Sequence, residues 1–201
     1  RGKVAPLWEV WQRHAAMLHL TPSQSRFAET FFCGDNCFLS GEGGSGKSYL
    51  VKALVDFLSK HRINVAVTAS TGISAFGIGG QTLHSFSGIG LGDEPIDQII
   101  SEVMKRGKVK ERIRAIDVLF LDEVSMIKGD ILDKVNAVFR AVRRNNDPFG
   151  SVLFCCIGDL YQLSPVFKGN EIQQLAFESS SWRAADIQTV VLKEQMRQRG
   201  D

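Results

Sequence analysis

A glycine-rich turn, lying between an apolar segment and a helix-forming segment, carries residues suited to binding phosphate. Gly41, four further residues and then Gly46-Lys47-Ser48 match the pattern G-x-x-x-x-G-K-[ST] of a phosphate-binding loop (P-loop). Glycines let backbone N–H groups approach an anion, and the next helix turns its positive end to the same anion. We expect the phosphates of a nucleotide to be bound by Gly41, Gly43, Gly44, Ser45, Gly46, Lys47, Ser48 and Tyr49.

An acidic pair, Asp122-Glu123, ends the apolar segment 116–121. Such a pair is common after an apolar strand, but about 75 residues beyond a P-loop it is typical of ATP hydrolysis. We expect the Ser48 hydroxyl and the Asp122 carboxylate to hold Mg²⁺, and Glu123 to polarise the attacking water. Gln162, just past the apolar segment 151–157, is placed to sense the γ-phosphate.

Small polar residues follow another predicted strand, 64–69. The segment 68–72 reads Thr-Ala-Ser-Thr-Gly, and ligands of parallel α/β sheets bind at this end of the strands. The alternative is a hydroxyl-rich turn with a capped helix. Farther along, His84 is either a ligand-contacting residue or a hydrogen-bonded structural histidine. The residues alone leave both choices open.

Apolar periodicity predicts the elements that must position these groups. Strands are expected before the P-loop and over 64–69, 116–121, 151–157 and 187–192, with helices to about residue 60 and over 129–144. Thr21-Pro22 starts a helix with Thr21 as its N-cap. Strands that alternate with helices favour a doubly wound, mainly parallel α/β sheet with helices on both faces, in a RecA-like layout.

The first 19 residues are predicted to be helical, with Leu7, Trp11, Met17 and Leu18 near one stripe and the tryptophans as packing anchors. A basic run follows a helix in 95–114. It is a solvated face or, as the less favoured alternative, a contact for a phosphate backbone. Its members are Lys105, Arg106, Lys108, Lys110, Arg112 and Arg114.

Composition bounds the class of protein. With 201 residues, 44% hydrophobic residues and a net charge of +2, the chain resembles an ordinary globular protein whose basic surface must be local. The longest apolar run, 152–157, is far shorter than a membrane span, and no signal peptide opens the chain. Four cysteines without zinc spacing indicate reduced, packed thiols and an intracellular location. Because the chain begins at Arg1 rather than Met, we expect it to be part of a longer protein.

Seven motifs in order resemble those of the petite-integration-frequency helicases of superfamily one, ATP-driven 5′-to-3′ DNA helicases. The resemblance covers residues 20–201 and leaves 1–19 unassigned. The motifs are Thr21-x-x-Gln24, GEGGSGKS at 41–48, TASTGISA at 68–75, GGQTLHSF at 79–86, DEVSM at 122–126, GDLYQLSPV at 158–166 and LKEQMRQ at 192–198.

The resemblance implies further roles. Gln24 would recognise adenine, and Arg197 would act as an arginine finger beside the catalytic Lys47, Asp122, Glu123 and Gln162. Single-stranded DNA would be contacted by Thr68, Ser70, Thr71, Gly72, His84, Ser85 and Phe86. The implied cofactors are ATP and Mg²⁺, and the implied partners are single-stranded DNA and DNA junctions. A monomer without membrane contact is implied, acting in DNA repair, recombination, replication and telomere maintenance. Its location would be a nucleus or mitochondrion, or else bacterial cytoplasm.

The resemblance also implies that residues 20–201 are the first of two RecA-like lobes, with the second absent. Such a half-built site should bind nucleotide weakly and hydrolyse little. Two alternatives remain: another P-loop ATPase or kinase, and a non-catalytic nucleic-acid-binding module of the same fold. A small-molecule kinase should have a lid and an acceptor-binding site, and the sequence shows neither. The non-catalytic binding module is disfavoured because Lys47, Asp122, Glu123 and Gln162 are all intact.

Overall fold

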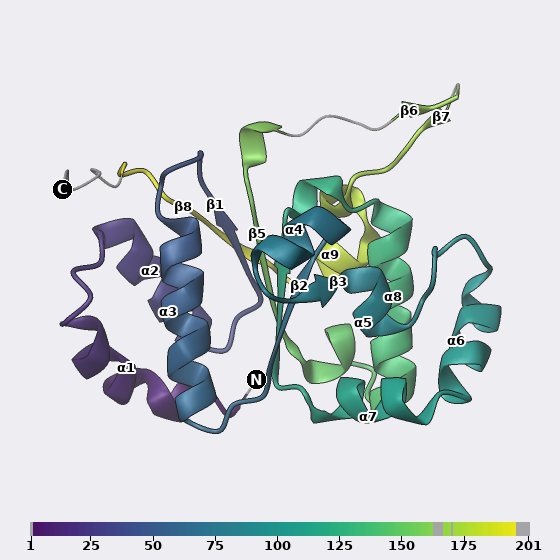
Figure 1. Ribbon diagram of the computed structural model, residues 1–201, viewed down its shortest axis with the longest axis horizontal. Coiled ribbons are helices and arrows are strands. Elements are labelled where there is room, and N and C mark those ends of the chain that lie inside the picture. The colour runs from purple at the N-terminus through teal and green to yellow at the C-terminus, as the bar shows by residue number, and fades with distance from the viewer. Residues whose placement is uncertain (1, 163–166, 170, 196–201) are drawn as a thin grey trace.

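A parallel sheet forms the centre of the computed structural model, which describes residues 2–162, 167–169 and 171–195 (Figure 1). Within this part of the chain the sheet has six strands. Their spatial order is β3 (Gln81–Thr82), β2 (Val65–Ala69), β4 (Val118–Asp122), β5 (Leu153–Gly158), β1 (Cys37–Ser40) and β8 (Gln188–Val191). All five neighbouring pairs are parallel, so every carboxyl end reaches the same edge. The predicted α/β class is confirmed.

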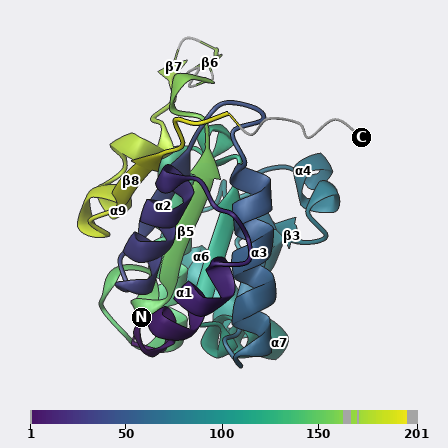
Figure 2. The same ribbon diagram turned by 90° about the vertical axis from the view of Figure 1, so that its left-hand side faces the viewer.

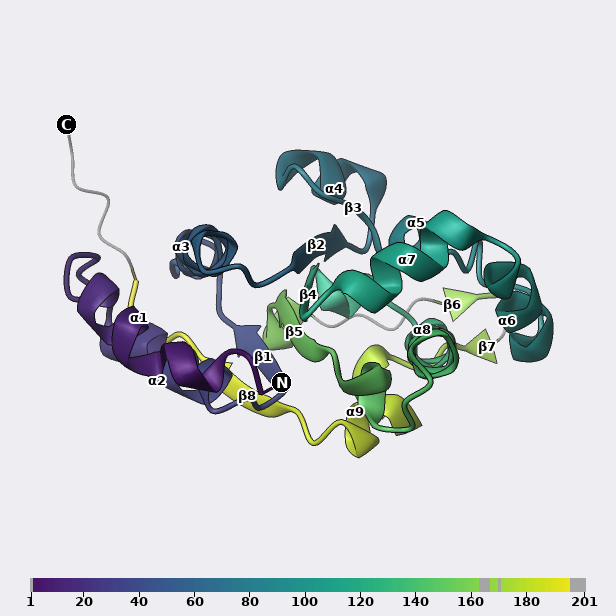
Figure 3. The same ribbon diagram turned by 90° about the horizontal axis from the view of Figure 1, so that it is seen from below.

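Helices cover both faces of the sheet (Figures 1 and 3). One face carries α1 (Trp8–Ala15), α2 (Pro22–Phe32) and α3 (Lys47–Lys60). The other carries α5 (Leu83–Ser87), α6 (Ile96–Met104), α7 (Gly107–Ala115), α8 (Gly129–Arg143) and α9 (Ser180–Ala184). The strands are apolar on both sides because both faces are buried.

The remaining elements lie mainly at turns. They are α4 (Gly72–Gly77), the short 3₁₀ turns Ala5–Leu7, Val124–Met126, Pro148–Ser151, Leu160–Gln162 and Ala176–Glu178, and the antiparallel hairpin of β6 (Phe167–Lys168) and β7 (Glu171–Ile172). The long strands and helices agree with the predicted ranges within a few residues. The sequence did not predict β3 or the hairpin, because two-residue strands carry no periodicity.

The N-terminal segment packs onto the lobe rather than extending from it. Trp11 is 1% exposed, and its ring lies 5.4 Å from that of Phe32 and 5.1 Å from that of Phe57. The tryptophan is therefore the packing anchor that was predicted. The predicted stripe is wrong at Met17, which is 79% exposed, because α1 ends at Ala15 and the chain turns away.

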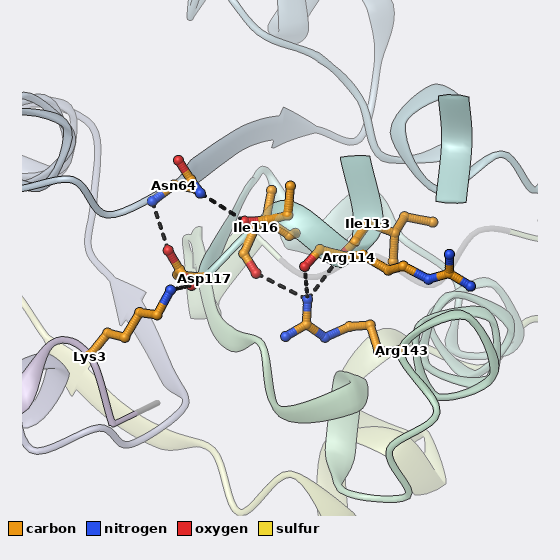
Figure 4. Close-up of polar contacts among 8 residues, drawn as sticks. Lys3, Asn64, Ile113, Arg114, Ile116, Asp117 and Arg143 are labelled. Carbon is orange, nitrogen blue, oxygen red and sulfur yellow. Dashed lines mark hydrogen bonds and ion pairs between the residues drawn. The ribbon is translucent and has the colours of Figure 1, made fainter. Parts of the chain in front are cut away.

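Polar contacts close the edge of the sheet opposite the P-loop (Figure 4). The Arg143 guanidinium on α8 donates to the carbonyls of Ile113, Arg114 and Ile116, at 2.8, 3.0 and 3.1 Å, where α7 leads into β4. Asp117 accepts from the Asn64 backbone N–H (2.9 Å) and pairs with Lys3 (3.0 Å). The three bonds from Arg143 occupy carbonyls at the end of α7 and just beyond it that would otherwise be left unpaired.

Three of the four cysteines, Cys37, Cys155 and Cys156, are buried, Cys33 is exposed, and all four are free thiols. Burial raises the pKa of Cys155 and Cys156 well above the usual thiol value, so both stay protonated. None of the helices formed by the described residues has the length and apolar character needed to cross a membrane.

The packing of α1 makes a stability prediction. Trp11→Ala should lower the free energy of unfolding by about 3–5 kcal/mol, because it leaves a cavity between Phe32 and Phe57. The matched control Met17→Ala, on the exposed turn, should change it by less than about 0.5 kcal/mol. Urea unfolding followed by circular dichroism measures both. Equal effects of the two substitutions would contradict the packing described here.

Candidate functional site

The carboxyl ends of four strands bring the predicted groups together. β1 leads into the P-loop, β4 into Asp122-Glu123, β5 into Asp159, and β2 into the 68–72 segment. Backbone bonds cross-link these turns: Gly41 N–H donates to the Gly158 carbonyl (3.2 Å), and Ser70 N–H donates to the Asp122 carbonyl (3.2 Å). The P-loop lies at the amino end of α3, with α4 beyond it (Figure 2). A site formed by distant segments therefore rests on one sheet edge.

The P-loop has the backbone of an anion-binding turn. Gly44 and Gly46 have φ values of 79° and 92°, which side-chain-bearing residues rarely adopt. A Cβ added to Gly43 or Gly44 would meet no protein atom within 4 Å, so the loop leaves open space on that side. The Ser45 hydroxyl is buried and has no hydrogen-bond partner among the described residues. An unpaired donor in a cradle of this kind fits a phosphate oxygen.

Lys47 folds back over its own loop. Its ammonium donates to the carbonyls of Gly41 and Glu42, the latter at 2.9 Å. Burial lowers the pKa of Lys47, whereas the negative charges of Asp159 and Asp122 raise it. A bound phosphate would replace these carbonyls as acceptors. Asp159 had no predicted role, although its place just after a buried strand was the signal that could have identified it.

The two acidic residues after β4 point to different partners. Burial raises the pKa of Asp122, and the Glu123 charge raises it further, while the Glu123 N–H (2.8 Å) and the Lys47 charge lower it. Glu123 has a left-handed backbone, with φ 53°, and its carboxylate accepts a 2.6 Å hydrogen bond from Ser74 Oγ on α4. Glu123 therefore faces α4, whereas the charge of Asp122 acts on the P-loop lysine.

The residues present fit a Mg²⁺ ion that shares its ligands with a nucleotide. Within the described ranges, no group of three or more His, Cys, Asp or Glu side chains converges closely enough to hold a metal. Magnesium typically uses one or two carboxylates and completes its shell with phosphates and water. Asp122 and the exposed Ser48 hydroxyl suit that arrangement, and both line one cavity of about 480 Å³.

Gln24 lies beneath the P-loop and is fully buried. Its Oε1 accepts from Thr21 N–H (2.9 Å), which completes a capping box on α2, and its Nε2 donates to the Gly46 carbonyl (3.2 Å). Thr-x-x-Gln is also the sequence of a capping box, a structural role for Gln24 that was not predicted from the sequence. Adenine recognition by Gln24 stays a prediction. Tyr49 turns away from the loop, because its hydroxyl donates to the Leu18 carbonyl (3.2 Å).

The remaining predicted catalytic residues differ in how far the structure places them. Gln162 is exposed in the turn after β5, where its N–H donates to the Asp159 carbonyl (3.2 Å). That turn is anchored by Ser40 Oγ, which accepts from Leu160 N–H (3.0 Å). Arg197 lies outside the described residues.

The 68–72 segment divides into a buried and an accessible part. Thr68 is fully buried and its hydroxyl donates to the Phe120 carbonyl (2.7 Å) inside the sheet. The prediction that Thr68 contacts single-stranded DNA is therefore wrong. Thr71 is half-buried and Gly72 is exposed, whereas the hydroxyl of the half-buried Ser70 is itself buried and has no hydrogen-bond partner among the described residues. Thr71 is the N-cap of α4, accepting from Ser74 N–H at 3.2 Å. The capping alternative is thus present, on a surface that remains open to a ligand.

The 84–86 segment divides in the same way. Ser85 is exposed and His84 is half-buried, but Phe86 is only 4% exposed and packs against Phe139 (6.3 Å between rings). This corrects the prediction that Phe86 contacts single-stranded DNA, since its ring belongs to the core. Burial lowers the pKa of His84, the charge of Lys128 lowers it further, and Asp93 opposes them. The imidazole is therefore neutral at pH 7.

Part of the basic run holds this segment in place. Arg112 donates to the carbonyls of Ser85 (2.5 Å) and Phe86 (2.8 Å) and lies 5.5 Å from the Phe86 ring centre. Arg106 donates to the Gly88 carbonyl (3.3 Å), and Arg114 donates to the Val142 carbonyl (3.1 Å). The two predicted alternatives, a solvated face and a contact for a phosphate backbone, do not describe these three arginines. The sequence could not show this, because it does not reveal which backbone carbonyls lie within reach of a side chain.

The sequence matches the family of PIF1-like helicases over residues 27–201. The chain belongs to the PIF1-like helicase family. The ATP-dependent DNA helicase PIF1 of Candida albicans is 41% identical over 192 residues, covering 90% of this chain and 21% of that protein. The human ATP-dependent DNA helicase PIF1 is 36% identical over 198 residues, covering 96% and 30% respectively.

Solved PIF1-like helicases share the fold. Pif1 helicase from Candida albicans superposes with a TM-score of 0.80 and 42% identity, over 90% of this chain and 41% of that chain. Bacteroides Pif1 in complex with ADP-AlF3 and ssDNA superposes with a TM-score of 0.73 and 30% identity, over 90% and 43%. The likeness confirms the predicted family and its RecA-like fold. The chain spans about a fifth of the length of the fungal relatives named PIF1.

The two readings of Gln24 separate experimentally. Gln24→Ala should lower the free energy of unfolding by about 1–2 kcal/mol without nucleotide, because it removes a cap and a buried hydrogen bond. Ser25→Ala, on the exposed side of α2, is the control. If Gln24 also recognises adenine, its substitution should reduce the preference for ATP over GTP in equilibrium binding. Lower stability with an unchanged preference would assign Gln24 to capping alone.

Proposed function

We propose that this chain is the first RecA-like lobe of an ATP-dependent DNA helicase that moves 5′-to-3′ on single-stranded DNA. The observation that carries the proposal is the convergence of Lys47, Asp122 and Glu123 at one sheet edge, beside the accessible part of the 68–72 segment. Membership of the PIF1-like helicase family supports it. So does the complex of Bacteroides Pif1 with ADP-AlF3 and ssDNA, which is 30% identical to this chain.

In this proposal the P-loop N–H groups and Lys47 bind the nucleotide phosphates. Ser48 and Asp122 hold Mg²⁺, which supplies positive charge at the β- and γ-phosphates when bound. Glu123 accepts the proton of the attacking water, and Gln162 reports the presence of the γ-phosphate. Arg197 acts as the arginine finger.

The DNA-facing residues are the accessible members of the two segments, Thr71, Gly72, His84 and Ser85. Ser70 is left out because its hydroxyl is buried and its N–H is bonded to the Asp122 carbonyl. Hydroxyl and backbone N–H donors suit phosphate oxygens, so we expect binding without sequence preference. Neutral His84 contributes as a hydrogen-bonding ring rather than as a cation. DNA junctions, a monomeric state and an intracellular location complete the proposal. One related structure concerns two coordinating Pif1 helicases at forked dsDNA, and light scattering on this protein with and without DNA tests the monomeric state.

Activity should depend on more than this lobe. The chain covers 41% of the solved Candida albicans Pif1 chain, so most of that helicase has no counterpart here. We therefore expect residues 1–201 to bind ATP weakly and to hydrolyse little, with or without single-stranded DNA. An ATPase assay on this chain and on the protein at its full natural length tests the proposal. Phosphate transfer to a nucleoside would instead indicate a kinase.

The role of Glu123 has a direct test. Glu123→Gln at full natural length should reduce ATP hydrolysis by at least about 100-fold, because the amide cannot accept the proton of water. ATP affinity should change little, since Lys47 and the P-loop remain. Steady-state hydrolysis and fluorescent-nucleotide binding measure the two effects. Hydrolysis that survives the substitution would exclude Glu123 as the base.

His84 and Phe86 should give different phenotypes. His84→Ala should weaken single-stranded DNA binding about fivefold or more, with unchanged nucleotide affinity and unfolding free energy, because a half-buried ligand contact is lost. Phe86→Ala should lower the free energy of unfolding by about 3–5 kcal/mol, and Phe86→Leu by much less. Fluorescence anisotropy and chemical unfolding distinguish them. Unchanged DNA affinity after His84→Ala would make this histidine structural.

A further inference from the structure

A chain of hydroxyl groups joins the proposed DNA surface to the proposed base. Thr71 Oγ1 donates to Ser74 Oγ (2.9 Å), and Ser74 Oγ donates to Glu123 Oε2 (2.6 Å). Ser74 N–H donates to Thr71 Oγ1 (3.2 Å), which fixes the distance between the two hydroxyls. Ser74 has no predicted role in either binding site, yet its hydroxyl joins the side chain of Thr71 to that of Glu123.

The Glu123 carboxylate depends on Ser74 for its direction. The backbone of Glu123 is held by bonds from its N–H to Asp122 (2.8 Å) and from Met126 N–H to its carbonyl (3.0 Å). Its side chain is exposed, and within the described residues Ser74 is the only group that hydrogen-bonds the carboxylate. Lys47 is influenced by Asp159 and Asp122, whereas Glu123 faces α4 instead.

We propose that Ser74 is a positioning residue that holds Glu123 against α4 until DNA binds at Thr71. The inference rests on the proposed function, because it assumes Glu123 as the base and Thr71 as a DNA contact. Releasing the carboxylate lets it turn toward the water beside the γ-phosphate. DNA binding thereby switches on hydrolysis.

The number of hydrogen bonds that each hydroxyl can donate explains how DNA binding would release Glu123. Each hydroxyl donates one hydrogen bond. Thr71 gives its proton to Ser74 in this structure, and that bond polarises Ser74 as a donor to Glu123. A DNA phosphate oxygen is a charged acceptor and competes for the Thr71 proton. When Thr71 turns to the phosphate, the bond from Ser74 to Glu123 weakens, and no covalent bond changes.

Helix α4 has room to follow such a change. Added Cβ atoms at Gly72 and Gly77, at its two ends, would meet no atom within 4 Å. Gly77 and Ile78 border the cavity of about 480 Å³ that separates them from α3. The outward side chains Ile73 and Phe76 are each 90% exposed, so they do not anchor the helix. A small shift of α4 therefore disturbs little core packing.

Ser74→Ala is the decisive variant, measured at the full natural length of the protein. Removing one charge-assisted hydrogen bond should raise the ATP hydrolysis rate without DNA about tenfold. The rate at saturating single-stranded DNA should stay within about twofold, because DNA already breaks that bond in the unmodified protein. Nucleotide affinity and melting temperature should not change. Ser74→Thr, which keeps the hydroxyl, should restore the low DNA-free rate.

Two controls connect the effect to Glu123. Ser101→Ala, at an exposed serine on α6, should alter neither rate. The double variant Ser74→Ala/Glu123→Gln should not hydrolyse ATP, which shows that the gained activity passes through Glu123. An unchanged DNA-free rate in Ser74→Ala, or a fall in both rates, overturns the inference. Absence of DNA stimulation in the unmodified protein refutes the proposed function itself, a result distinguishable from either.

Discussion

All strands of this sheet run in one direction, so all their carboxyl ends meet at one edge, and the site depends on that constraint. The P-loop, the acidic pair after β4, the turn after β5 and the 68–72 segment are separated by up to about 120 residues in sequence. The parallel register makes them neighbours, and backbone hydrogen bonds between adjacent turns hold them together. The amino ends of the strands, closed by Arg143 and Asp117, carry stability instead. The edge at the amino ends of the strands is thus closed by hydrogen bonds, while the edge at their carboxyl ends keeps polar groups available for a ligand.

The sequence predicted this arrangement because each strand is long, apolar and followed by a polar turn. Periodicity and turn chemistry are local properties, and they located the P-loop, Asp122 and Glu123 correctly at the strand ends. The errors concern side chains with two competing environments. Phe86 and Thr68 belong to motifs that resemble DNA contacts, but both are buried. Gln24 fits a capping box and an adenine contact equally well in sequence. Only the tertiary packing reveals which environment each side chain occupies.

Burial and charge are balanced at the nucleotide site. Burial opposes the charged forms of both Lys47 and Asp122, and each supplies part of the compensation for the other. Lys47 already donates hydrogen bonds to carbonyls of its own loop, so binding a phosphate replaces these acceptors and adds no net hydrogen bond. Such an exchange limits the net gain from a nucleotide.

The packing of α1 shows that the folded lobe includes residues before the stretch that matches the PIF1-like helicase family. The match to the PIF1-like helicase family begins at residue 27, although the human relative aligns over 96% of this chain, and Trp11 covers Phe32 and Phe57. A lobe trimmed to the family boundary would present these aromatic rings to water as one apolar patch. Patches of this kind promote self-association. The segment before the first recognisable motif thus covers apolar rings of the lobe, and we expect it to favour solubility.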